Sequence, residues 1–418
     1  MSTTLAACGD AGTPTLNWYV NPEGVETLQA VAEGCSTDDF KIAVQQLPSS
    51  ATDQRTQLAR RLAARDSSTD LMSLDPVYVP EFASAGWLHE LPDKYATEAG
   101  SDDLLAGALD AITWDGKPVA FSQWANTQVL WYRKSLAQAA GLDMTQPVTW
   151  DQVIQAAADN NGSVGVQANK YEGYVVWLNS LIEGAGGTIV DDTEAGAKAK
   201  VTIDSDAGRD AAKVIETLAD SPARQADLSV SNEGTSLGRM FPADPAAPQG
   251  AGEFMVNWTF VYKNYEPGDG KDTTAEQFDD LGWARYPQTV AGEESRPPLG
   301  GIEIGVGAYT DHPDYALQAA ECLTSAESQV KYALEIGWMP SRASAYDSAE
   351  LRDAYPADLL TLFRESIDNA GTRPKTAFYN TISSALQARW HPASAVDDDT
   401  PARSAKFVED ILEGRSLL

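Results

Sequence analysis

The chain has 418 residues, and its 61 acidic and 30 basic residues give a formal net charge of −31. This charge is repelled by the phosphate backbone of nucleic acids and by anionic lipid headgroups, which argues against binding to nucleic acid or electrostatically to a membrane. The hydrophobic content of 43% is sufficient for packed cores in about two domains. A cationic substrate could use the acidic surface, but a solvated surface that keeps an exported protein soluble is the preferred interpretation.

The first residues resemble the processing site of a bacterial lipoprotein. Residues 5–8 (Leu-Ala-Ala-Cys) place small residues before Cys8, whose thiol would carry a diacylglycerol group. The charged and apolar parts of a signal peptide do not precede this motif, so we expect residues 1–14 to be a lipobox remnant and tether. A buried structural cysteine is the alternative. No run approaches the ~20 apolar residues of a membrane-spanning helix, so Cys8 predicts a lipid anchor at the outer face of the cell membrane.

The first third of the chain alternates between strand and helix patterns. In chain order these are a strand at 16–20, a helix with Val25, Leu28, Ala32 and Cys35 on one face, a strand at 40–44, a helix with Asp53 as its N-cap, and a short strand at 71–74. This order predicts a mostly parallel sheet covered by helices on both faces. Ligands bind beyond the carboxyl ends of such strands, where Asp75 would lie.

Two cysteines remain after Cys8, and each lies in an amphipathic helical stretch. In an oxidising compartment, Cys35 and Cys322 are expected to form one disulfide that joins an early helix to a late helix of the same lobe. In the chain-entropy model, closing so long a loop stabilises the fold by about 4–5 kcal/mol, less any strain. Two separate buried thiols are the alternative.

The remainder of the chain mixes strands with longer helices. We predict strands at 118–121 and 129–132, with residues 122–127 between them as the first crossing between two lobes. Thr149 and Gln152 form a capping box at the start of a helix. Further helices are predicted at 174–183 and 206–219, strands at 253–258 and 302–306, a loop at 268–280, and mostly helices after that.

Motifs for catalysis or metal binding are lacking. The histidines His89, His312 and His391 have no nearby cysteine or carboxylate spacing that suggests a metal site. A nucleophile elbow, a Walker A loop and a Rossmann fingerprint are also missing, and the glycines at 184–187 follow a helix, which favours a helix-ending turn. We expect no cofactor, although residue type alone does not exclude a pair of glycosidase carboxylates.

A set of planar polar groups and tryptophans falls at predicted strand ends and lobe crossings. Carboxylates and amides can accept two sugar hydroxyls in a fork, a guanidinium donates in a matching fork, and an indole covers the C–H face of a sugar. Each residue alone is more often structural, and Trp258 could belong to a core. Together they predict a carbohydrate cleft, formed by Asp75, Trp124, Asn126, Glu233, Asn257, Trp258 and Arg373.

Several segments resemble the extracytoplasmic solute-binding proteins of carbohydrate ABC importers, almost from end to end. These segments are residues 57–62, 69–75, 81–87, 126–133, 147–151 and the Gly-x-x-Pro-x-Arg turn at 337–342. Within the family, the chain is most similar to the trehalose-binding lipoproteins of actinobacteria. That similarity is carried by residues 167–177, 233–236, 256–258, 300–301 and 373–379 and by the Cys35/Cys322 pair.

The resemblance implies an α/β, two-lobed fold of the maltose-binding-protein type with three interlobe crossings. The N-terminal lobe would comprise residues 15–122 and 303–341, and the C-terminal lobe residues 123–302 and 342–418. It also implies a monomer without enzymatic activity that captures a disaccharide, with trehalose as the first candidate, and delivers it to an ABC permease. Another α-glucoside, a malto-oligosaccharide or a peptide is the alternative cargo, and a secreted glycosidase is the alternative class.

Residue by residue, the resemblance implies that the sugar contacts Asp75, Asn126, Glu233, Trp258 and Arg373, with the Gly301 backbone and Asn257 nearby. The sequence departs from the family pattern after the first strand, where either Glu23 replaces an acidic contact or that contact is lost. Trp124 and Trp338 occupy positions where smaller residues are expected, so they would change the shape of the pocket.

Overall fold

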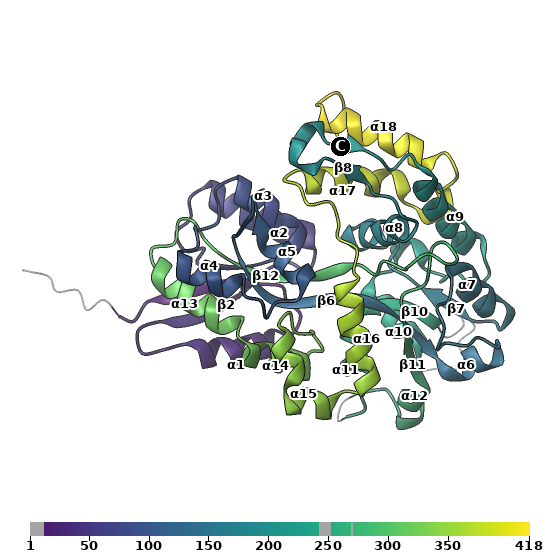
Figure 1. Cartoon of the computed structure of the whole chain (residues 1–418), viewed down its shortest axis with the longest axis horizontal. Helices are drawn as coiled ribbons and strands as arrows, with labels where there is room; N and C mark the ends of the chain where they lie inside the picture. The colour runs from purple at the N-terminus through teal and green to yellow at the C-terminus, as the bar shows by residue number, and fades with distance from the viewer. Residues whose placement is uncertain (1–11, 242–251, 269–270) are drawn as a thin grey trace, which may run out of the picture.

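Two α/β lobes lie side by side and are joined by long strands that run between them (Figure 1). This computed structural model describes residues 12–241, 252–268 and 271–418. Cys8 and the predicted lipobox lie outside the described residues. None of the helices in these ranges is long and apolar enough to cross a membrane.

One mixed sheet extends through both lobes, with the strand order β2-β1-β3-β12-β6-β10-β7 and with β11 also paired to β6. The pairing of β1 with β2 and β3 is parallel, which confirms the arrangement predicted from the alternating strands and helices. β12 lies between β3 and β6 and runs antiparallel to both. The strands are β1 (Thr15–Val20), β2 (Lys41–Gln46), β3 (Leu71–Leu74), β6 (Phe121–Arg133), β7 (Ser163–Gly165), β10 (Gly252–Trp258), β11 (Leu281–Ala284) and β12 (Leu299–Val306).

Strand β6 is the main connection between the lobes. The prediction of two short strands separated by a crossing at 122–127 is wrong, because residues 121–133 form one continuous strand. Its first half pairs with β12, and its second half pairs with β10 and β11. The polar side chains of this segment are buried, so the sequence lacks the alternation of apolar and polar residues that would predict a strand here. The number of crossings and the lobe boundaries stay predictions.

In the N-terminal lobe, α1 (Val25–Cys35) and α13 (Pro313–Leu323) pack against one another and are joined by the predicted Cys35–Cys322 disulfide. Helix α2 (Ala51–Ala63) buries Leu58 and Leu62. The N-cap prediction of Asp53 is wrong, because the Ser50 hydroxyl accepts the hydrogen bond from the Asp53 N–H. Asp53 lies instead in the first turn, where its charge interacts favourably with the helix dipole.

The C-terminal lobe is built around α8 (Glu172–Gly184), whose side chains are almost all buried. It packs against α9 (Asp206–Asp220) and α17 (Tyr379–Trp390), and α17 packs against α18 (Thr400–Leu412). Helix α7 (Trp150–Asp159) begins with the predicted capping box of Thr149 and Gln152. The predicted turn after α8 is also present, with Gly186 at φ +78°.

Shorter elements complete both lobes. The loop predicted at 268–280 is wrong in its second half, because Thr274 and Gln277 form a capping box that starts α12. The remaining helices are α3 (Val79–Ser84), α4 (Asp93–Ala99), α5 (Ala106–Ile112), α6 (Lys134–Ala139), α10 (Glu233–Met240), α11 (Val261–Tyr265), α12 (Ala275–Asp280), α14 (Ala326–Glu335), α15 (Ala349–Ala354) and α16 (Ala357–Asp368). Two small hairpins pair β4 (Thr113–Trp114) with β5 (Lys117–Pro118) and β8 (Val190–Asp191) with β9 (Lys200–Val201).

Candidate ligand-binding site

Asp75 follows β3 directly and caps a short 3-10 turn, where its carboxylate accepts a hydrogen bond from the Val77 N–H at 3.3 Å. The same carboxylate pairs with Arg373, with 2.8 Å between Oδ1 and Nη2. Arg373 precedes α17 of the C-terminal lobe, so this ion pair joins the two lobes. Two of the predicted sugar contacts, 298 positions apart in the chain, are therefore in contact.

Arg373 has a second carboxylate partner, Glu172, which is the first residue of α8. Its Nη1 lies 2.8 Å from Glu172 Oε1, and Glu172 also accepts hydrogen bonds from the hydroxyls of Tyr379 and Ser383. Burial raises the pKa of the Glu172 carboxyl, while the Arg373 charge acts in the opposite direction. Burial works against the charge of Arg373, but Asp75, Tyr379 and Glu172 keep the pKa of its guanidinium well above the ordinary value.

Glu233, the first residue of α10, lies beside Trp258 at the end of β10. Its Oε2 accepts a hydrogen bond from the Tyr171 hydroxyl at 2.8 Å. Burial raises the pKa of the Glu233 carboxyl, and the nearby charge of Glu23 adds to this, whereas hydrogen bonds from Tyr171 and Trp258 lower it. Glu23 itself is exposed and accepts a hydrogen bond from the Asn21 amide at 3.1 Å. This places the candidate replacement contact close enough to Glu233 to influence its protonation.

The backbone of β12 approaches Trp258 and β6 closely at two adjacent glycines. Gly300 pairs with Asn126 of β6, and a Cβ atom on Gly300 would lie 2.7 Å from the Trp258 ring, so the indole rests directly against this glycine. Gly301 has a φ of +137°, and a Cβ there would lie 2.4 Å from the Trp124 carbonyl oxygen. Glycines at both positions therefore let the backbone approach its neighbours closely.

Asn126 and Asn257 have their amide oxygens occupied by protein groups. Asn126 Oδ1 accepts hydrogen bonds from the Thr259 hydroxyl at 2.9 Å and from the Thr127 N–H at 3.0 Å. Asn257 is fully buried, and its Nδ2 donates to the Glu233 carbonyl oxygen at 3.1 Å. These contacts fix the start of α10 to the end of β10. Whether either amide also contacts a sugar stays a prediction.

Trp124 and Trp338 stack on one another, with ring centroids 4.5 Å apart and an interplanar angle of 14°. Only 6% of Trp124 and 5% of Trp338 is exposed, and both belong to the hydrophobic core of the N-terminal lobe. They fill space behind the site and leave little surface for a ligand.

The predicted contacts thus gather in two groups, Asp75 with Arg373, and Glu233 with Trp258, Asn257, Asn126 and the β12 glycines. Tyr171 and Glu172, adjacent in the chain, each hold one group, and sequence reasoning did not select either of them. Both fall in segment 167–177, which carries part of the family resemblance, but an aromatic and an acidic residue at a helix start are common structural features.

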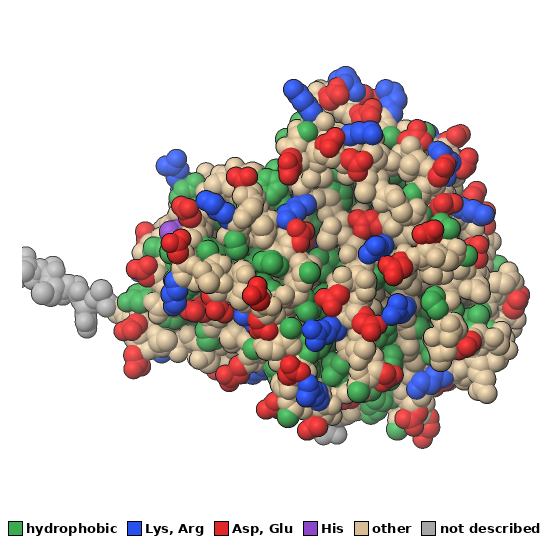
Figure 2. All heavy atoms as spheres, viewed as in Figure 1, with side chains coloured by type: hydrophobic (Ala, Val, Ile, Leu, Met, Phe, Trp, Pro, Cys, Tyr) green, Lys and Arg blue, Asp and Glu red, His purple; other side chains and the backbone are tan. Residues whose placement is uncertain are grey.

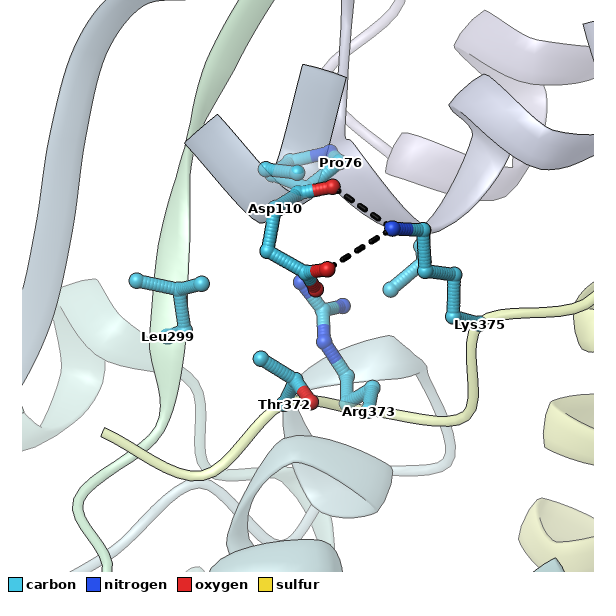
Figure 3. Close-up of a pocket in the computed structure, with 8 residues that line it drawn as sticks. Pro76, Asp110, Leu299, Thr372, Arg373 and Lys375 are labelled. Carbon is cyan, nitrogen blue, oxygen red and sulfur yellow. Dashed lines mark hydrogen bonds and ion pairs between the residues drawn. The ribbon is translucent and has the colours of Figure 1, made fainter. Parts of the chain in front are cut away.

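A small pocket next to Arg373 shows how the segment before α17 is tied to the other lobe (Figure 3). Lys375 Nζ lies 2.8 Å from both the carbonyl oxygen and Oδ1 of Asp110 in α5. The pocket is lined by Pro76, Val77, Asp110, Ala111, Leu299, Thr372, Arg373 and Lys375. The described ranges contain no group of three or more His, Cys, Asp or Glu side chains arranged to hold a metal ion.

Comparisons with known proteins agree with this architecture. The model of the family described as bacterial extracellular solute-binding protein matches residues 21–330. A probable ABC transporter-binding protein of Deinococcus radiodurans is 25% identical over 366 residues, which cover 82% of this chain and 79% of that protein.

Solved structures share the fold. Maltose-bound MalE3 of T. maritima has a TM-score of 0.81 and 23% identity, covering 96% of this chain and all of the other. A solute-binding protein of Agrobacterium vitis with bound D-mannitol has a TM-score of 0.75 and 19% identity over 96% of this chain and 98% of its own. The two-lobed fold of the maltose-binding-protein type is therefore confirmed.

Proposed function

We propose that this chain, which belongs to the family of bacterial extracellular solute-binding proteins, captures a sugar between its lobes and delivers it to an ABC importer. As a member of that family it is an extracytoplasmic binding protein and not an enzyme. The first candidate ligand is the disaccharide trehalose. Anchoring through a lipid on Cys8 and function as a monomer are parts of the same proposal.

The single observation that carries the proposal is the meeting of Asp75 and Arg373 from opposite lobes, with Glu233 and Trp258 linked to this pair through the adjacent residues Glu172 and Tyr171. Fork-shaped acceptors, a guanidinium and an indole face are the groups that recognise the vicinal hydroxyls and the C–H face of a sugar. The relative from D. radiodurans supports the transporter partnership, and the maltose and mannitol bound by the structural neighbours support a polyhydroxylated ligand.

The mechanism that we propose is hinge closure about β6 and β12. A sugar that touches both lobes stabilises the closed form, because its contacts with one lobe are lost when the lobes separate. The Asp75–Arg373 ion pair shows that the two lobes can approach to hydrogen-bond distance at the site. The closed protein would then dock on the permease, which receives energy from ATP on a separate subunit.

A second candidate ligand is a maltose-type glucoside or a malto-oligosaccharide. The maltose bound to MalE3 of T. maritima, a neighbour with a TM-score of 0.81, favours this alternative. The departure at Glu23, which is exposed and lies near Glu233, bears on which of these sugars fits.

Calorimetry with a panel of trehalose, maltose, maltotriose and mannitol tests the proposal. Trp258→Ala is expected to weaken binding of the best ligand about 10- to 100-fold, as the loss of one aromatic burial surface predicts. Trp283→Ala is the matched control, because this half-buried indole of β11 donates to Asp358 on α16 and not to the candidate site. Failure to bind any panel sugar would overturn the sugar assignment, and unchanged affinity in Trp258→Ala would overturn the location of the site.

A further inference from the structure

The start of α8 holds both groups of predicted contacts. We propose that Tyr171 and Glu172 form a positioning element that fixes Glu233 and Arg373 in their ligand-binding orientations before the lobes close. This inference rests on the proposed function, since it concerns the same site. Neither residue is among the predicted sugar contacts.

Glu172 is fully engaged by protein donors. Its Oε1 accepts from Arg373 at 2.8 Å and from the Tyr379 hydroxyl, and its Oε2 accepts from Ser383 Oγ at 2.5 Å. Only 8% of the Glu172 side chain is exposed. A carboxylate so enclosed has little capacity left for a ligand hydroxyl, so its effect on binding must pass through its partners.

The two carboxylate partners of Arg373 differ in what happens when the hinge opens. Asp75 belongs to the opposite lobe and leaves with it, whereas Glu172 lies on α8, which packs against α17 in the lobe that carries Arg373. The Arg373 side chain is only 3% exposed, and a buried cation without a counter-charge is strongly disfavoured. Glu172 therefore keeps the guanidinium charged, buried and oriented when Asp75 is absent.

The orientation leaves donors for a ligand. The Nη2 group faces Asp75, and Nε is buried with no hydrogen-bond partner among the described residues. Buried donors are nearly always satisfied in native proteins, so an unpaired Nε beside the candidate site suits a sugar hydroxyl. Opening of the lobes would release Nη2 as a second donor.

Tyr171 acts in the same way on the other group. Its ring folds back over Gly173, where a Cβ atom would lie only 2.3 Å from the ring, and its hydroxyl donates to Glu233 Oε2 at 2.8 Å. Glycine at position 173 is therefore required for the ring to reach this position. Tyr171 and Trp258 both donate to the Glu233 carboxylate, so its orientation is set by protein groups before a ligand arrives.

A double-mutant cycle on sugar affinity tests the inference. Glu172→Gln keeps the shape and hydrogen-bonding capacity of the side chain but removes its charge, and we expect about 10- to 100-fold weaker binding of the best panel sugar. Arg373→Gln is expected to weaken binding at least as much, and the double variant no more than Arg373→Gln alone, because Glu172 acts only through Arg373. Glu183→Gln, which changes a half-buried carboxylate farther along the same helix, is the matched control and should bind normally.

The cycle separates positioning from general stabilisation, because a purely structural effect of Glu172→Gln would persist in the Arg373→Gln background. Such persistence, or wild-type affinity in Glu172→Gln, would overturn the inference. Tyr171→Phe alone should weaken binding several-fold. Added to Glu233→Gln, it should cause no further loss of affinity. An additive loss would show that Tyr171 does not belong to the positioning element. If the wild-type protein binds no sugar, the proposed function fails and this inference with it. If the wild-type protein binds a sugar and Trp258→Ala does not, the proposed function stands, and the double-mutant cycle then tests the positioning role alone.

Discussion

At the scale of single residues, Glu183 is the clearest source of pH-dependent stability. It lies on α8 against Gly371, and burial raises the pKa of its carboxyl to about 7, against the opposing effects of Asn179 and Arg296. A carboxyl with a raised pKa stabilises the fold below its unfolded value of 4.5, and this stabilisation is lost as the pH rises through 7. Between pH 4.5 and pH 7 the wild-type protein should therefore lose unfolding free energy on the order of 3 kcal/mol, and Glu183→Gln should not show this loss.

Urea unfolding at pH 5 and pH 8 measures this effect as the difference between wild type and variant. The unfolding free energy of Glu183→Gln is expected to exceed that of wild type at pH 8 and to converge with it toward pH 5. Glu216→Gln, which makes the same substitution on the exposed side of α9, is the matched control. A parallel pH dependence in wild type and Glu183→Gln would contradict the assignment.

The adjacent glycines of β12 should respond differently to the same substitution. Gly301→Ala would place a Cβ 2.4 Å from a backbone oxygen at a φ of +137°, so we expect it to lower the unfolding free energy by about 1–3 kcal/mol. Gly300→Ala would meet the far end of the Trp258 ring at 2.7 Å, which a rotation of the indole can relieve. Gly300→Ala is thus expected to weaken sugar binding with little loss of thermal stability, and equal thermal losses in both variants would contradict this view.

At the scale of elements, the sequence pattern was informative where apolar residues follow a helix or strand period. The alternation of β1, α1, β2, α2 and β3 is predicted correctly for this reason. Strand β6 is not, because its central residues are polar and are buried only through contacts with distant strands. The capping box of α12 is present in the sequence, but the surrounding Gly and Asp residues favoured a loop.

At the candidate site, too, some features could be predicted from the sequence and others could not. Asp75 could be placed because a residue that follows a buried parallel strand lies at the ligand-binding edge of the sheet. Its pairing with Arg373 could not be inferred from spacing, since the two residues are 298 positions apart. Glu172 was missed because its partners, Arg373, Tyr379 and Ser383, come from a segment some 200 positions away.

The disulfide between α1 and α13 gives a prediction at the element scale. Replacing both Cys35 and Cys322 with Ala should lower the unfolding free energy by about 2–5 kcal/mol, because the bridge restricts a very long loop of the unfolded chain. Sugar affinity should be almost unchanged, since neither cysteine contacts the candidate site. Chemical denaturation of the variant, compared with wild type under non-reducing conditions, measures the first effect, and calorimetry measures the second. A stability equal to that of wild type would contradict a structural role for the bridge.

At the scale of the whole molecule, charge bears on the class of sugar. Carboxylates are spread over both lobes with basic side chains between them (Figure 2), and the formal net charge is −31. The candidate site follows this trend, because Asp75 and Glu172 both pair with the guanidinium of Arg373, and Glu23 lies near Glu233 in the second group of predicted contacts. The two carboxylates that pair with Arg373 already exceed its charge, and Glu23 and Glu233 add to the negative potential.

An anionic sugar should therefore be rejected both on approach and in the site. We expect trehalose 6-phosphate to bind at least about 100-fold more weakly than trehalose, because the phosphate is repelled by the partly buried carboxylates of the candidate site, whose charges salt screens less than charges on an open surface. Raising the salt concentration should reduce this difference in affinity, because salt screens the repulsion of the phosphate. The affinity for trehalose, which is uncharged, should not fall. Glu23→Gln should reduce the difference in affinity between the two sugars further. Glu23 is exposed, so its charge can be removed without disturbing the buried network around Glu172. Equal binding of the two sugars by calorimetry would show that Arg373, and not the surrounding carboxylates, sets the potential that a ligand meets.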